Sequence, residues 1–206
     1  MNRPTKLIAA ATSVALSLLF VIVYGGCNWV TVHRNAVGMW YFSWEYLIPF
    51  VPVMIVPYMS INLFFLSAPF LCRTRGELRT FALRICFAIV IAGVCFLLLP
   101  LKFAAASPPV SGWMGGVFNF LHRFDQPYNL VPSLHITFRT ILAHLFARHT
   151  KGIVRAASNI WFCLIGFSTV LTYQHHLVDV IAGFILAAVC FYLFRETKDP
   201  AVDETG

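Results

Sequence analysis

Charged side chains are scarce in this sequence. Only 11% of its 206 residues are Asp, Glu, Lys or Arg, whereas 59% are hydrophobic and the mean hydropathy is +0.78. Soluble domains carry about 25% charged residues, so the composition excludes an ordinary soluble fold and indicates an integral membrane protein. No internal repeat or low-complexity tract divides the chain. We therefore expect one domain over residues 1–206, with its core at about 50–195.

Metal-binding patterns are also missing. The eight Asp and Glu residues are too few and too scattered to hold Mg²⁺. The six cysteines form no CxxC pair and have no zinc-site spacing. We expect no metal site and no cofactor.

Long apolar runs dominate what is present, and each is near the length of about 20 residues that a membrane helix needs. These runs predict an all-α fold, a bundle of six transmembrane helices over residues 7–24, 47–71, 80–101, 132–148, 158–173 and 177–194. Residues 28–46 are polar and aromatic, typical of an interfacial loop or short helix in which Glu45 is a wetted headgroup contact. Residues 102–131 form the longest predicted loop, and long loops usually carry function.

Basic residues are unevenly distributed between the two ends of these spans. The end opposite the N-terminus has three, Arg34, Lys102 and Arg123, and Arg139 falls within the fourth span. The N-terminal side has eleven: Arg3, Lys6, Arg73, Arg75, Arg79, Arg84, Arg148, Lys151, Arg155, Arg195 and Lys198. The positive-inside rule then puts both termini in the cytoplasm of a cell membrane, for which we expect a bacterial inner membrane. The net charge of +7, placed in this way, suits anionic lipid headgroups and not nucleic acid.

One polar cluster lies between the last two spans, on the outer side. The stretch Tyr173–Val180 reads YQHHLVDV and places His175 and Asp179 four residues apart, on one face of a helix. An Asp that binds one imidazole nitrogen fixes the tautomer and leaves the other nitrogen free as a nucleophile or base. His176 lies three residues before Asp179, so spacing alone does not separate it from His175.

A second polar cluster begins the fourth span, at Pro132–His135. Ser133 and the first amides of that helix offer an anion cradle, and His135 can protonate a leaving alkoxide. Lys102 adds a positive charge from the preceding loop. With His175 as nucleophile, these residues suit cleavage of an anionic phosphate ester through a phosphohistidine at the outer membrane face.

Arg139 lies one helical turn below His135 on the same face. A charged residue within a span costs about 2.5–3.5 kcal/mol, so it is usually partnered or functional. Two interpretations stay open, a contact with phosphate or a buried ion pair with Asp179 or Asp125. For His122 we expect an ordinary satisfied polar group.

These motifs resemble the type 2 phosphatidic acid phosphatase superfamily, whose membrane members have six helices and an active site at the outer face. Pro132–His135 matches the family's Pro-Ser-x-His motif in full. Ser168, His175 and Asp179 match a second motif, although Thr169 stands where the family has Arg. The resemblance implies His175 as nucleophile, Asp179 as its orienting partner and His135 as the acid.

The family's remaining motif begins with a lysine, to which Lys102 corresponds, but Ser107-Pro108-Pro109 contains no arginine. Two phosphate-binding arginines of the family are therefore missing. The candidates to replace them are Arg139, Arg123 and Gln174. We expect Ser133 and Ser168 to be further substrate-binding residues. The His-His-x-x-Asp form and the approach FDQPYN to Pro132 resemble a divergent branch that includes inositol-phosphoryl transferases.

The leading hypothesis is a metal-independent phosphatase that cleaves a lipid phosphate monoester or diphosphate in the bilayer. One alternative is a phosphotransferase that passes a lipid-linked phosphoryl group to an alcohol through the same residues. Another is a transporter or scaffold with a degenerate site, since intramembrane charge also marks transport pathways. The oligomeric state is left open.

Overall fold

The computed structural model describes residues 3–105, 108–124, 126 and 128–196. Ser107, Asp125 and Lys198, which the sequence analysis names, lie outside this part of the chain. The described residues form two short 3-10 helices, η1 (Ser43–Leu47) and η2 (Pro52–Met54), and seven α-helices: α1 (Lys6–Val32), α2 (Ile55–Leu71), α3 (Arg75–Leu98), α4 (Gly112–Phe124), α5 (Leu134–His149), α6 (Gly152–Leu171) and α7 (Leu177–Leu193).

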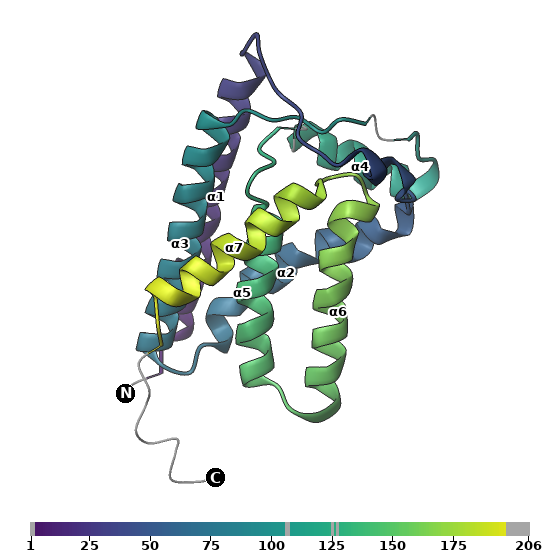
Figure 1. Ribbon diagram of the computed structural model, residues 1–206. Coiled ribbons are helices and arrows are strands. Elements are labelled where there is room, and N and C mark those ends of the chain that lie inside the picture. The colour runs from purple at the N-terminus through teal and green to yellow at the C-terminus, as the bar shows by residue number, and fades with distance from the viewer. Residues whose placement is uncertain (1–2, 106–107, 125, 127, 197–206) are drawn as a thin grey trace.

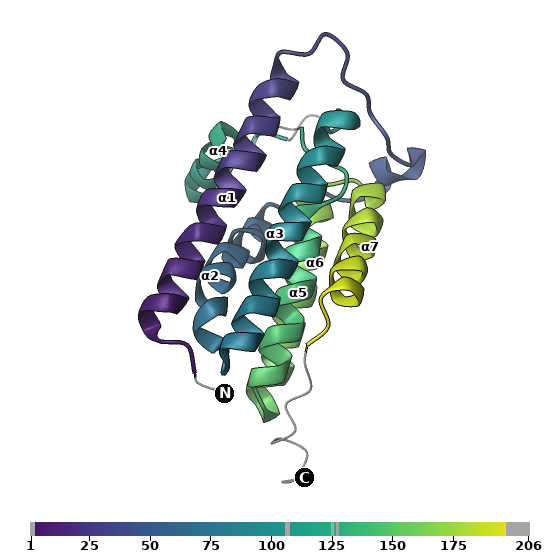
Figure 2. The same ribbon diagram turned by 90° about the vertical axis from the view of Figure 1, so that its left-hand side faces the viewer.

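Helix α5 lies at the centre of the bundle. It packs against α2, α3, α6 and α7, while α1 covers α2 and α3 (Figures 1 and 2). Helices α5 and α7 both begin at the end that is uppermost in Figure 1, here called the site end. The loop from α5 to α6 and the start of α3 lie at the opposite end, here called the far end.

Four helices of the described chain are long and apolar enough to cross a membrane: α1, α3, α6 and the continuous helix Pro52–Leu71. Helix α7 is apolar but shorter, with 17 residues. Helix α5 has 16 residues, several of them polar. The structure supports the predicted helical membrane bundle in this coarser form, and six spans with the site at the outer face stay a prediction.

Several helix boundaries differ from the sequence-based prediction. Helix α1 continues to Val32 and takes in the start of the predicted interfacial segment, where η1 forms the short helix that was expected. Helix α2 begins only at Ile55, because prolines at positions 49 and 52 remove backbone donors ahead of it.

The predicted loop over residues 102–131 was wrong in one respect, because it contains the amphipathic helix α4. Phe118 and Leu121, one turn apart, pack on Ile55 and Tyr58 of α2. Helix α4 lies at the site end (Figure 1).

A close contact joins α5 to α7 near the site end. The Ser133 amide donates to the Asp179 carbonyl over 3.1 Å, and the Thr137 hydroxyl contacts the Gly183 carbonyl at 3.0 Å. A Cβ atom at Gly183 would lie 2.6 Å from the Ser133 carbonyl oxygen and 2.9 Å from Cβ of Ile136. Glycine at position 183 therefore permits the helices to approach this closely.

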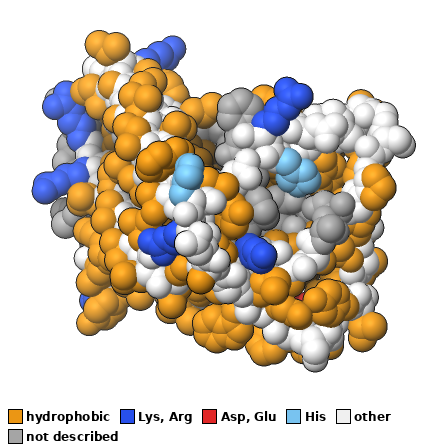
Figure 3. Space-filling model, turned by 90° about the horizontal axis from the view of Figure 1, so that it is seen from above, with side chains coloured by type: hydrophobic (Ala, Val, Ile, Leu, Met, Phe, Trp, Pro, Cys, Tyr) orange, Lys and Arg blue, Asp and Glu red, His pale blue; other side chains and the backbone are white. Residues whose placement is uncertain are grey.

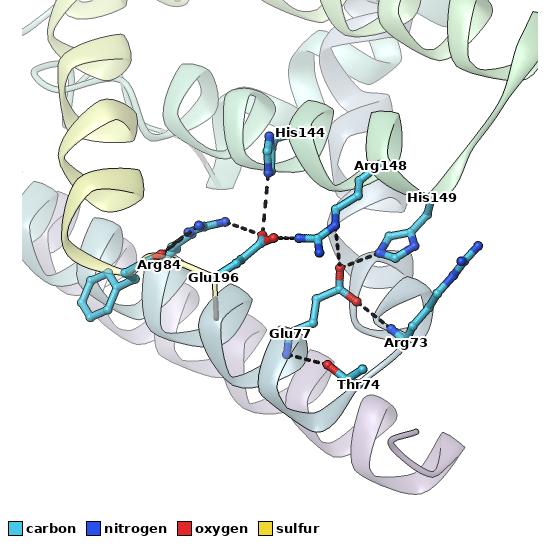
Figure 4. A network of polar contacts seen from close by, with 9 residues as sticks. Arg73, Thr74, Glu77, Arg84, His144, Arg148, His149 and Glu196 are labelled. Atoms are coloured by element: carbon cyan, nitrogen blue, oxygen red, sulfur yellow. Dashed lines mark hydrogen bonds and ion pairs between the residues drawn. The ribbon is translucent and has the colours of Figure 1, made fainter. Parts of the chain in front are cut away.

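Polar contacts hold the far end together (Figure 4). Glu77 of α3 contacts His149 of α5 at 2.6 Å. The buried Arg84 contacts Glu196, just beyond α7, at 3.1 Å, and Glu196 also pairs with Arg148 of α5. These ion pairs connect three helix ends where the sequence carries most of its basic residues, and the orientation of that end toward the cytoplasm stays a prediction.

We expect Gly183→Ala to lower the free energy of unfolding by about 1–3 kcal/mol, because the added methyl group overpacks the α5–α7 contact. Gly25→Ala in α1 is the control, since no atom lies within 4 Å of its added Cβ. That variant should be neutral or stabilising by about 0.5–1 kcal/mol. Denaturant titration in detergent micelles measures both, and equal stability of the two variants would contradict the close contact.

Candidate active site

A tight turn between α6 and α7 positions His175. The amides of Gln174 and His175 both donate to the Thr169 carbonyl, each over 3.0 Å. Tyr173 adopts a left-handed backbone conformation, with φ of 56°, and its hydroxyl donates to the Ile48 carbonyl over 2.8 Å. The turn is therefore held from both sides, and Thr169, at the position where the family has Arg, contributes its backbone to it.

Asp179 lies in the first turn of α7 and is fully buried. Its Oδ2 accepts a 2.8 Å hydrogen bond from the His176 amide and lies 3.3 Å from Nδ1 of His175. The predicted pair of His175 and Asp179 is thus brought together. With Nδ1 directed at the carboxylate, Nε2 of His175 is the nitrogen left to attack a substrate.

His176 is engaged at both ring nitrogens, which distinguishes it from His175. Its Nε2 accepts from the Ala104 amide over 3.1 Å, so Nδ1 carries the proton that faces Glu45, 2.8 Å away. The ring stacks on Phe103 with centroids 4.1 Å apart. Glu45 is only 8% exposed, so its predicted role as a wetted headgroup contact was wrong.

His135 lies beside a small cavity that His175 also lines. The His135 ring stacks on Tyr58 with centroids 4.1 Å apart, and its buried Nε2 has no hydrogen-bond partner among the described residues. Both histidines line one cavity of about 90 Å³. Its other walls are mainly apolar and aromatic and include Phe20, Ile61, Phe65, Leu134 and Phe138.

His175 also lines a larger cavity of about 720 Å³. No acidic side chain of the described residues lines it. Seen from above the site end, Lys, Arg and His side chains stand out among hydrophobic ones, and acidic side chains are nearly absent (Figure 3). The cavity therefore suits an anion, and its polar lining is made by Lys102, His122, Gln126, Gln174, Tyr24, Tyr128 and Tyr173.

Three other predicted substrate-binding residues do not line these two cavities. Ser133 is fully buried as the N-cap of α5, where its Oγ accepts from the Ile136 amide over 3.2 Å. Ser168 is also buried and donates to the Ile165 carbonyl over 2.7 Å. Arg123 is exposed on α4. Their contact with substrate stays a prediction.

Arg139 turns toward α6. Its Nε donates to the Phe162 carbonyl over 2.7 Å, and its guanidinium lies 5.6 Å from the centre of the Phe184 ring. It lines neither cavity, and it has no ion pair with Asp179. These contacts favour a structural role with a backbone partner, and the predicted pair with Asp125 lies outside the described residues.

Sequence reasoning missed two residues at this site. Glu45 is 131 positions from His176, and no local pattern connects them. His122 was expected to be an ordinary polar group, yet it lines the large cavity. Its place in the amphipathic pattern of α4 was the available signal.

The fold and these side chains define a helical membrane protein with a histidine–aspartate pair and a second histidine at a pocket suited to an anion. Residues 17–193 match the family model of the PAP2 superfamily, and the chain belongs to that superfamily. Membership supports phosphatase-like phosphoryl transfer in general. No match was found among curated proteins or among solved structures.

We expect Arg139→Gln to lower the free energy of unfolding by about 1.5–3 kcal/mol, because a charged donor to the Phe162 carbonyl is lost. Its KM for a phosphate ester should not change. Lys102→Gln should leave the free energy of unfolding unchanged. It should raise KM about tenfold or more, since Lys102 lines the large cavity. Denaturation and steady-state kinetics separate the two, and a raised KM in Arg139→Gln would instead place that side chain on the phosphate.

Proposed function

We propose that the protein cleaves a lipid phosphate monoester or diphosphate at the outer membrane face, through a phosphohistidine on His175 and without a metal. The observation that carries this proposal is the convergence of His175, held by Asp179, and His135, with an unpartnered Nε2, on one cavity. Membership of the PAP2 superfamily supports the reaction class.

The first step forms a bond between Nε2 of His175 and phosphorus and breaks the bond from phosphorus to the lipid oxygen. His135 gives its proton to that oxygen, and the phosphate anion beside it stabilises the protonated ring beforehand. In the second step water attacks the phosphohistidine, His135 takes a proton from the water, and the nitrogen–phosphorus bond breaks. Asp179 keeps its proton-accepting contact with Nδ1 of His175 throughout.

The lipid character of the substrate is supported by the small cavity. Its aromatic and aliphatic walls come from α1, α2 and α5, and α1 and α2 belong to helices apolar enough to cross a membrane. An apolar chain can lie against these walls while the phosphate reaches His175 from the cationic side. The basic far end supports the orientation in which the site end faces outward.

We expect His175→Ala to abolish phosphate release from phosphatidate and from p-nitrophenyl phosphate alike, because the nucleophile is gone. His135→Ala should lose about 10²–10⁴-fold on phosphatidate, the usual contribution of general acid catalysis. It should lose far less on p-nitrophenyl phosphate, whose leaving phenolate needs no proton. Colorimetric phosphate release in mixed micelles measures all four activities.

Vanadate, which mimics the pentacoordinate phosphoryl group, should inhibit wild-type protein in the same assay. Phosphate release by His175→Ala at the wild-type rate would contradict the phosphohistidine intermediate. Equal losses of His135→Ala on both substrates would contradict its role as acid. Vanadate-insensitive flux of a solute through liposomes, surviving in His175→Ala, would favour the transporter.

A phosphotransferase is the second candidate, and the size of the large cavity favours it. A volume of about 720 Å³ far exceeds that of a phosphate and a water molecule, and Gln126, Gln174 and Tyr128 offer it neutral hydrogen-bonding groups. Such walls suit an alcohol with several hydroxyls, which would replace water in the second step.

We expect labelled phosphate from a lipid donor to appear on a polyol such as inositol or glycerol when that acceptor is supplied, at the expense of free phosphate. Gln174→Ala should raise the KM for the acceptor, because Gln174 is one of the neutral hydrogen-bonding groups of the large cavity. Thin-layer separation of labelled products measures both. Free phosphate as the sole product at every acceptor concentration would favour the phosphatase.

A further inference from the structure

Glu45 and His176 form a second carboxylate–imidazole pair directly behind the first. Both side chains are buried, with Glu45 8% and His176 3% exposed. Oε1 of Glu45 accepts from the Phe42 amide over 3.0 Å, and Oε2 faces Nδ1 of His176 at 2.8 Å and the Leu177 amide at 3.3 Å. All the described contacts of this carboxylate are therefore with donors.

His176 connects the pair to the rest of the site. Its ring lies between Tyr41 and Phe103, with centroids 5.2 and 4.1 Å away, and accepts from the Ala104 amide. Its own amide donates to Oδ2 of Asp179, the oxygen that faces His175. Moving His176 therefore moves the carboxylate that orients the nucleophile.

The same ring also fixes the segment that carries the positive charge. Phe103 and Ala104, which contact His176, directly follow Lys102, and all three line the large cavity. One buried imidazole thus sets the distance between the cationic wall of the cavity and His175.

Building on the proposed function, we infer that Glu45 is a positioning residue, which acts through His176 to hold His175, Asp179 and Lys102 in register for phosphoryl transfer. Glu45 does not line the large cavity, and its contacts with the site are those with His176 and the Leu177 amide. A glutamine at position 45 cannot replace it. Its amide offers one acceptor oxygen, whereas the Phe42 amide lies on one side and the His176 and Leu177 donors on the other.

The far end supplies a matched control. Glu77 and His149 form a pair of the same chemistry, 2.6 Å apart and with side chains 9% and 7% exposed, at the opposite end of the bundle (Figure 4). Glu77→Gln removes an equally buried carboxylate from a helix end without touching the site. Any general loss of stability from removing such a carboxylate appears in both variants.

The test compares full-length wild type, Glu45→Gln and Glu77→Gln on phosphatidate in mixed micelles. We expect kcat of Glu45→Gln to fall on the order of 10²-fold, the effect of a misplaced nucleophile, and its KM to rise less than in Lys102→Gln, because Lys102 is displaced but keeps its charge. Glu77→Gln should keep kcat while its unfolding midpoint falls. Glu45→Asp, which keeps the charge but shortens the side chain, should recover part of the loss and also serves if Glu45→Gln does not fold. An unchanged kcat in Glu45→Gln, or an equal loss in Glu77→Gln, would overturn the inference.

A readout without substrate separates this inference from the proposed function. Nitrogen-15 spectra of labelled histidine, with His175 assigned from the His175→Ala variant, report the hydrogen bonds of its ring. Glu45→Gln should shift the His175 signals and Glu77→Gln should not. If no variant and no wild type releases or transfers phosphate, the proposed function fails, and the spectra still decide the positioning role. His175 signals that are the same in wild type and Glu45→Gln would refute it.

Discussion

The site depends on one backbone hydrogen bond, from the Ser133 amide to the Asp179 carbonyl over 3.1 Å. It ties the first turn of α5 to the first turn of α7, and the Thr137–Gly183 contact continues the attachment one turn further on. His135 follows Ser133 by two residues and Asp179 follows His175 by four, so the distance between the two histidines is set by backbone and not by flexible side chains. Such a rigid frame suits catalysis, because displacing a catalytic group by about 1 Å lowers the reaction rate strongly.

Much of this site was predictable because its parts are local in sequence. The spacing of His175 and Asp179 predicted that the two side chains meet, and they do, although His175 lies in the turn before α7 and not on its face. The Pro132–His135 stretch marks a helix start, and α5 begins there. The apolar runs likewise predicted most helices. Local patterns have physical causes that act within one turn, so one sequence suffices to detect them.

Other parts were not predictable, each for its own reason. Glu45 acts on His176 across 131 residues, and a single sequence carries no trace of such a contact. Helix α4 lies in a segment with glycines at 112, 115 and 116, which lowers its helix propensity, and its packing on α2 overrides that cost. Arg139 binds the backbone carbonyl of Phe162. Every residue has such a carbonyl, so no pattern of side chains in the sequence reveals this partner.

Those contacts also change how phosphate binding has to be understood in a chain that lacks two of its family's arginines. Arg139 is committed to α6, so the described charge at the large cavity comes from Lys102, with His122 beside it. Helix α5 begins at the site end with a partial positive charge of about half a unit, whereas the carboxylates of Asp179 and Glu45 accept from the first amides of α7 and offset its charge. One helix dipole and one lysine form a weaker and more diffuse field than two forked guanidinium groups. Under the proposed function, the contacts that a lipid phosphate makes with the cavity walls add to this weaker attraction, and free phosphate lacks those contacts.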